Sequence, residues 1–237
     1  MPSHLQSLKE EVLRANQSLV RNKLVTHTWG NASAIDRSEQ IVVIKPSGVP
    51  YDKMGTEDLV CVDLNTGKTI DGEKRPSSDL PTHIHLYQNF PEVGGVVHVH
   101  STFAVAWAQA KMAIPCVGTT HADYFNGDIP VTRSLTPDEV EESYEKHTGT
   151  VITDLFKERE LCPLEMPGVL VSQHGPFCWG VDVASAAKHA SIMETLAKMA
   201  HLSFSLNSGM KTLPNYILEK HYSRKHGPDA YYGQIKQ

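Results

Sequence analysis

Gly95-Val96-Val97-His98-Val99-His100 is the stretch that decides the fold and also points to a site. Its apolar residues predict a buried β-strand, and side chains two residues apart on a strand project from the same face. His98 and His100 therefore point together, at the end of an apolar run where two unpaired imidazoles would be costly to bury. Neutral imidazole is a common zinc ligand, and a catalytic zinc usually has three protein ligands. The stretch predicts a metal site; the alternative is a pair of solvent-facing histidines at a strand end.

A third metal ligand has to come from another segment of the chain. His174 is the best candidate, because it follows the apolar strand predicted at 168–171 and precedes a Gly-Pro turn. His121 competes with it, as does the pair His83 and His85. That pair lies in a predicted helix, where positions i and i+2 diverge, so it would form a poor joint site.

Outward from this strand, helical and strand-like patterns alternate along the chain. Thr136-Pro137-Asp138-Glu139, for example, combines a capping box with proline at the first helical position. The interleaving predicts an α/β fold, a three-layer α/β/α sandwich, with residues 1–237 as a single domain. Hairpin-like spacing of the early strands favours a mixed, largely antiparallel sheet. Helices are expected near the N-terminus and at 82–90, 104–110, 137–160, after Asp182 and from 215, and strands at 41–44, 59–62, 95–100, within 114–132 and at 168–171.

Composition excludes several classes of protein. The 237 residues are 40% apolar and 21% charged, an ordinary globular composition that argues against disorder. The net charge of −5 offers no basic excess for nucleic acid or an anionic membrane. The four cysteines are scattered along the chain, so we expect reduced thiols. There is no signal-peptide pattern and no long apolar span, so we expect a cytoplasmic protein.

Three short loops carry small polar residues: Gly30-Asn31, Ser47-Gly48 and Ser77-Ser78-Asp79. Backbone N–H groups and hydroxyls in such loops can converge on an anion. Each loop is also an ordinary turn when taken alone, and sequence spacing does not show whether the three meet. No G-x-G-x-x-G fingerprint, complete P-loop or G-x-S-x-G elbow occurs, which argues against a nicotinamide enzyme and a serine hydrolase.

With these residues assembled, the sequence resembles the class II aldolase/epimerase superfamily and, within it, the L-ribulose-5-phosphate 4-epimerase family of arabinose catabolism. The resemblance covers nearly the whole chain. It is carried by motifs in order: Leu24-Val25-Thr26 to Trp29-Gly30-Asn31, Ile44-Lys45-Pro46-Ser47-Gly48-Val49, Lys74-Arg75-Pro76-Ser77-Ser78-Asp79, His98-Val99-His100-Ser101, Gly118-Thr119-Thr120-His121-Ala122-Asp123-Tyr124-Phe125, Met166 to Val171, His174-Gly175-Pro176-Phe177, Lys220-His221-Tyr222, Arg224-Lys225-His226-Gly227 and Ala230-Tyr231-Tyr232-Gly233-Gln234.

The resemblance implies one zinc ion per subunit, held by His98, His100 and His174 with Asp79 at or beside the metal; Mn²⁺ or Co²⁺ are alternatives. It also implies that the small polar loops bind a pentulose 5-phosphate substrate. The residues concerned are Gly30, Asn31, Ser47, Gly48, Ser77 and Ser78.

The resemblance further implies that Asp123 and Tyr232 form the proton-transfer pair. We expect Asp123 near the metal-bearing strand ends. Family members are typically cytoplasmic homotetramers, so the tail at about 215–237 is expected to contribute to the site of a neighbouring subunit. Neither nucleic acid nor membrane is expected as a partner.

The implied reaction inverts C4 of a 2-ketopentose phosphate. C4 is not adjacent to the C2 carbonyl, so simple deprotonation cannot invert it. Oxidation of the C4 hydroxyl needs a nicotinamide, whose fingerprint is missing, whereas retro-aldol cleavage of C3–C4 needs a Lewis acid. The rivals are a class II aldolase of the L-fuculose-phosphate type and a non-catalytic module that binds metal or sugar phosphate. In such aldolases the residue after the paired serines is usually Glu, and Asp79 here favours epimerisation.

Overall fold

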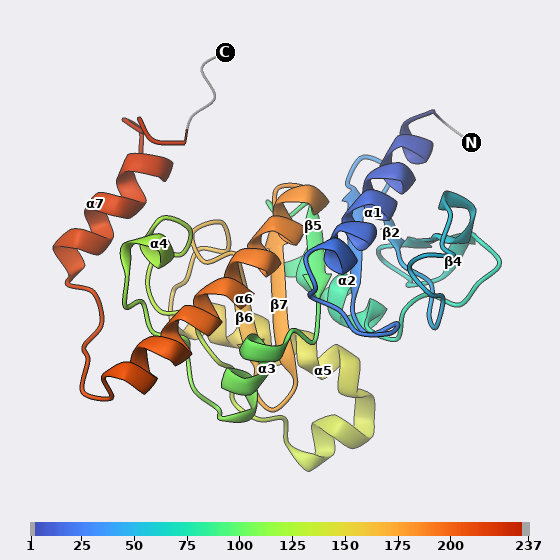
Figure 1. Cartoon of the computed structure of the whole chain (residues 1–237). Coiled ribbons are helices and arrows are strands. Elements are labelled where there is room, and N and C mark those ends of the chain that lie inside the picture. Colours follow the sequence, from blue (N-terminus) through green and yellow to red (C-terminus); the bar gives the residue numbers. More distant parts are fainter. Residues whose placement is uncertain (1–2, 234–237) are drawn as a thin grey trace.

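A seven-stranded sheet forms the centre of the protein in a computed structural model that describes residues 3–233 (Figure 1). All six neighbouring pairs of these strands are antiparallel, and one isolated parallel bridge joins Val131, which lies outside the strands, to Leu170 of β6. The predicted, largely antiparallel sheet is therefore confirmed. In spatial order the strands are β4 (Thr69–Asp71), β3 (Val60–Asp63), β2 (Ile41–Ile44), β1 (Asn31–Asp36), β5 (Gly95–His98), β7 (Gly175–Gly180) and β6 (Gly168–Val171).

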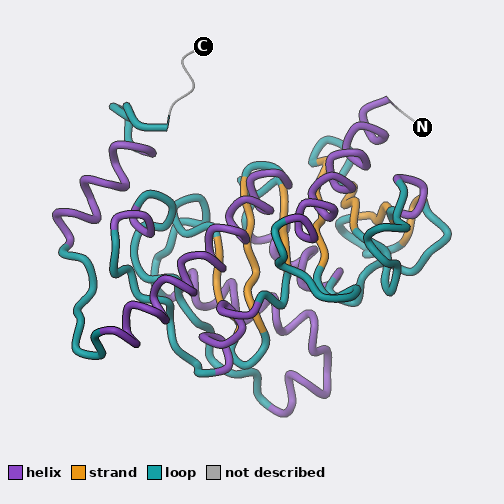
Figure 2. Tube along the Cα trace, in the orientation of Figure 1, coloured by secondary structure: helices purple, strands orange, loops and turns teal. Residues whose placement is uncertain are grey.

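Helices cover both faces of this sheet, as the three-layer prediction requires (Figures 1 and 2). Helix α1 lies on one face, where the side-chain amide of Asn16 forms hydrogen bonds with the backbone of Ala32 in β1. On the other face, the Ser33 hydroxyl bonds to two side chains of α2, His83 and Tyr87. The helices are α1 (Ser3–Arg21), the 3-10 turn at Thr56–Asp58, α2 (Leu80–Asn89), α3 (Thr102–Gln109), α4 (Thr119–Ala122), α5 (Pro137–Glu158), α6 (Val183–Leu206) and α7 (Asn215–His226).

Two helix starts follow the capping signals of the sequence. The Thr136 hydroxyl accepts from the Glu139 backbone N–H, and the Glu139 carboxylate accepts from the Thr136 N–H. Asp182 accepts from the Ser185 N–H at 2.6 Å and starts α6. Such side chains satisfy backbone donors that have no partner inside the helix.

The segment 114–132 differs from the expectation of a strand-rich stretch. It contains the short helix α4 and takes part in isolated bridges only, between Ile114 and Ile129 and between Val131 and Leu170. Strands β1, β4 and β7 were not predicted. β1 is rich in small and polar residues, and β7 begins with Gly-Pro, so neither has the usual composition of a strand.

The register of the sheet determines where the site lies. Asn31, at the start of β1, pairs with His98, at the end of β5, and His98 pairs with Phe177 of β7. The turn between β6 and β7 lies at the same end of the sheet, because Val171 pairs with Gly175. Three segments that are distant in sequence therefore meet at one sheet end. Within residues 3–233, no helix is long and apolar enough to cross a membrane.

Candidate metal and sugar-phosphate site

A cavity of about 510 Å³ opens at this end of the sheet. Its walls come from the start of β1, the loops after β2 and β4, the end of β5, the turn between β6 and β7, and α5. The lining includes all four residues predicted at the metal and all six predicted at the substrate: Asp79, His98, His100, His174, Gly30, Asn31, Ser47, Gly48, Ser77 and Ser78.

Three histidines converge in this cavity. His98 ends β5, His100 follows two residues later, and His174 lies in the turn between β6 and β7. One ring nitrogen of each lies within 4.8 Å of those of the other two. The three segments thus bring together the residues that the sequence singled out, while metal binding itself stays a prediction. His121 and His83 lie elsewhere: His121 donates to the Gly127 carbonyl, and His83 bonds to Ser33.

The protonation of these rings suits a metal ion. The Nδ1–H of His98 donates to the Pro176 carbonyl at 3.0 Å, which leaves its Nε2 lone pair facing His100 at 2.9 Å. Burial, together with the neighbouring histidines, lowers the pKa of His98 and of His174 to about 3. Burial also lowers the pKa of His100, although Asp79 opposes this shift. Three neutral imidazoles with converging nitrogens are the donor set that zinc prefers.

Asp79 lies beside the histidines but outside their cluster. It is the N-cap residue of α2, and its carboxylate accepts a hydrogen bond from the Asn31 amide at 2.6 Å. The same amide nitrogen donates to the Ser77 hydroxyl at 2.9 Å. Asn31 therefore joins its own small polar loop to the loop Ser77-Ser78-Asp79 beside the histidines. Direct ligation of a metal by Asp79 stays a prediction.

The small polar loops are joined by backbone hydrogen bonds. The Ser77 N–H donates to the Lys45 carbonyl at 3.0 Å, and the Ser47 N–H donates to the Arg75 carbonyl at 2.9 Å. Gly30 has φ of +88°, and a Cβ atom there would lie 2.7 Å from the His98 carbonyl oxygen. Only glycine permits that approach of β1 to β5 without strain. The three loops, whose meeting sequence spacing left open, are therefore adjacent in the fold.

Sequence reasoning missed four charged or polar residues of the cavity: Thr28, Lys45, Tyr144 and Glu145. Lys45 is 2% exposed, and burial lowers its pKa to about 8. Its ammonium lies 4.8 Å from the centre of the Tyr51 ring and donates to the Pro46 carbonyl. A lysine directly after an apolar strand was the available signal. Tyr144 and Glu145 lay in a predicted helix, and only packing directs that helix to the cavity.

Asp123 and Tyr232 lie away from this cavity, so the expectation that Asp123 lies near the metal-bearing strand ends is wrong within one chain. Asp123 is 8% exposed and follows α4, which packs on α7. Arg224 of α7 donates to both of its carboxylate oxygens, at 3.0 and 3.1 Å, and His221 lies 3.2 Å from one of them. The Tyr232 ring stacks on the Arg224 guanidinium at 4.2 Å.

These four side chains form a second polar cluster, named here the α7 cluster: Asp123, His221, Arg224 and Tyr232. The tail was predicted to extend to residue 237, and residues 234–237 lie outside the described part. The structure brings the two predicted proton-transfer residues together on one guanidinium. It does not bring them to the histidines of the same chain.

The family of the chain follows from comparison with known proteins. Residues 10–201 match the model of the Class II Aldolase and Adducin N-terminal domain, and the chain belongs to that family. It is 55% identical over 230 residues to the protein of Salmonella paratyphi A named L-ribulose-5-phosphate 4-epimerase UlaF, covering 97% of this chain and all of that one. The Salmonella typhi protein of the same name gives the same values.

Solved structures agree on the fold. An L-fuculose 1-phosphate aldolase superposes with a TM-score of 0.77 at 24% identity, covering 92% of this chain and 95% of that one. An aldolase II superfamily protein from Pseudomonas syringae superposes with a TM-score of 0.76 at 15% identity, covering 97% and 90%. At these identities the likeness supports the α/β architecture and does not indicate a substrate.

Proposed function

We propose that this protein is an epimerase that interconverts L-ribulose 5-phosphate and D-xylulose 5-phosphate by inverting C4, and that it uses zinc. The 55% identity to curated epimerases over nearly their whole length carries the substrate assignment. The convergence of His98, His100 and His174 beside three small polar loops supports the chemistry. Mn²⁺ or Co²⁺ are alternative ions.

The three imidazoles fit a divalent metal, since each offers a neutral nitrogen to a common point and Asp79 lies next to them. When bound, such an ion supplies Lewis-acid stabilisation of the negative charge that develops on the ketose oxygens. The chain is large enough to form a hydrophobic core without a structural metal ion, so we expect the ion to serve catalysis rather than folding.

We assign the phosphate to the small polar loops of the cavity. Ser47, Ser77 and Ser78 line it with hydroxyls and backbone groups, and Gly48 has φ of +70°, typical of a tight turn. Lys45, the one lysine among the residues that line this cavity, contributes a positive charge. A buried ammonium without a carboxylate partner is stabilised by an anionic ligand. Anchoring the phosphate there would keep the cleaved fragment from leaving.

The reaction we propose breaks C3–C4 and then re-forms it. The C4 hydroxyl gives its proton to a base of the α7 cluster, the C3–C4 electron pair moves to the ketose fragment as an enediolate, and C4 becomes an aldehyde. Asn31, which already bonds to Asp79 and Ser77, is placed to hold polar oxygens of the fragments. After the aldehyde rotates, C3 attacks its other face, and the new C4 oxygen takes a proton from the opposite acid/base group.

Asp123 and Tyr232 are the acid/base groups we assign, and they would reach the histidines of a neighbouring chain. The supporting observation is the separation of the α7 cluster from the histidine cavity within one chain. A closed homo-oligomer, for which we propose a tetramer, would place the α7 cluster of each chain at the cavity of the next. We propose a cytoplasmic enzyme of pentose catabolism, in arabinose or ascorbate breakdown.

Incubation with L-ribulose 5-phosphate tests the proposal. The expected products are D-xylulose 5-phosphate at its equilibrium proportion and no accumulating glycolaldehyde phosphate. Steady release of free glycolaldehyde phosphate would instead identify an aldolase. No turnover of the purified, zinc-loaded protein would favour a non-catalytic module that binds sugar phosphate.

A further inference from the structure

Helix α5 is broken beside the histidine cavity. Ser143 has φ of −168° and ψ of 86°, so the first turns from Pro137 to Glu142 are a separate helical segment. Tyr144, the first residue after the break, is one of the cavity-lining residues. An unbroken helix would give residue 144 a different direction, because each helical residue turns the side chain by about 100°.

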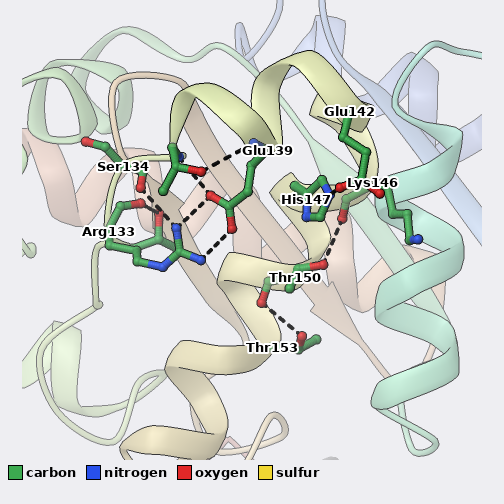
Figure 3. A network of polar contacts seen from close by, with 10 residues as sticks. Arg133, Ser134, Glu139, Glu142, Lys146, His147, Thr150 and Thr153 are labelled. Carbon is green, nitrogen blue, oxygen red and sulfur yellow. Dashed lines mark hydrogen bonds and ion pairs between the residues drawn. The ribbon is translucent and has the colours of Figure 1, made fainter.

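Polar contacts lie on both sides of the break, and Figure 3 shows those between Arg133 and Glu139 and between His147 and Glu142. Before it, the Arg133 guanidinium donates two hydrogen bonds to the Glu139 carboxylate, at 2.7 and 2.8 Å. Across it, His147 Nε2 lies 3.0 Å from Glu142. After it, the Thr82 hydroxyl of α2 donates to the Glu145 carbonyl. Arg133 lowers the pKa of Glu139 to about 2, so this carboxylate stays ionised at physiological pH.

The break delivers the Tyr144 hydroxyl to one of the three histidines. Its oxygen lies 3.2 Å from Nδ1 of His174, and the two rings are 5.9 Å apart with a tilt of 38°. His98 has the equivalent contact, because its Nδ1–H donates to the Pro176 carbonyl. A histidine that ligates a metal through Nε2 carries its proton on Nδ1, and a partner for that proton fixes the ring and its tautomer.

We propose that Tyr144 is a positioning residue of the metal site, whose hydroxyl accepts the Nδ1–H of His174 and so directs Nε2 toward His98 and His100. The break at Ser143 and the Arg133–Glu139 ion pair hold the hydroxyl in place. This inference rests on the proposed metal function of the three histidines. It assigns to α5 a role that the apolar pattern of the helix does not indicate.

The test measures zinc affinity of the full-length chain by competition with a chromophoric chelator, without substrate. Tyr144→Phe removes one oxygen and keeps the ring, so we expect the zinc Kd to rise about 10- to 100-fold, the usual effect of losing an outer hydrogen bond to a metal ligand. The absorption spectrum of the Co²⁺-loaded protein should change as well. Tyr216→Phe is the matched control, since Tyr216 is 72% exposed, and its Kd should equal that of the unchanged protein.

A double-mutant cycle tests the ion pair. Glu139→Gln should weaken zinc binding when Tyr144 is present. In the Tyr144→Phe background the same substitution should have little further effect, because the ion pair acts through the Tyr144 hydroxyl. An unchanged Kd and Co²⁺ spectrum in Tyr144→Phe would overturn the role of Tyr144 while leaving the metal site intact. Equal, additive losses would overturn the role of the ion pair. If the unchanged protein binds no zinc, the metal proposal fails and this inference with it.

Discussion

Mixing two inactive chains tests whether the catalytic site is shared between neighbours. The first chain carries His100→Ala, which removes an exposed member of the histidine cluster without opening a core cavity. The second carries Tyr232→Phe, which removes the hydroxyl and leaves the ring stacked on Arg224. Each chain keeps the half of the site that the other has lost.

The expected recovery follows from the separation of the two clusters. If chains mix randomly at equal amounts, a site needs an intact His100 from one chain and an intact Tyr232 from its neighbour, so about one quarter of the sites become functional. Loss of one positioned acid/base group leaves about 10⁻² to 10⁻⁴ of the rate, so Tyr232→Phe alone contributes little background. The mixture should therefore exceed either parent more than about tenfold.

The assay uses co-expressed chains with different tags, purified through both tags in sequence, and measures conversion of L-ribulose 5-phosphate. The control mixes the unchanged chain with a chain that carries both substitutions. A shared site predicts about one quarter of full activity in that control, whereas a site within one chain predicts about one half. Activity of the two-variant mixture equal to the mean of its parents would refute the shared site.

Three further predictions concern the metal, the phosphate and the fold. His174→Ala should abolish zinc retention, measured by metal analysis, while the far-ultraviolet circular dichroism stays unchanged; stoichiometric zinc would remove His174 from the ligand set. The affinity for inorganic phosphate should fall as pH rises through about 8, where Lys45 loses its proton. The Lys45→Met variant should bind phosphate weakly at every pH, without this decline. The same decline in the variant would exclude Lys45 as the group responsible. Glu194 accepts from the Phe103 and Ala104 N–H groups, both at 2.9 Å, so Glu194→Ala should lower the unfolding free energy by about 1–3 kcal/mol, with Glu194→Gln in between. Urea titration measures this, and an unchanged midpoint would contradict it.

The sequence by itself determined the local patterns. Strand alternation predicts His98 and His100 on one face, and their rings do meet although β5 ends at His98. A capping box starts α5 after Thr136. Both patterns depend on neighbouring residues only. His174 was chosen as the third candidate ligand because it follows an apolar strand, and the β6–β7 turn does place it beside His98. The prediction of strands within 114–132 was wrong, because the apolar residues there pack in the core but form only isolated bridges with other segments.

Tertiary structure alone decided which distant residues meet. The register of β1, β5 and β7 places Asn31, His98 and Phe177 side by side, and no local pattern encodes that register. A break inside α5 brings Tyr144 to His174, against a helical pattern that continues through it. Packing of α4 on α7 pairs Asp123 with Arg224 and keeps it from the histidines of its own chain. Side-chain identity limits the chemistry available, whereas the distance between groups depends on long-range packing, to which short sequence patterns are insensitive.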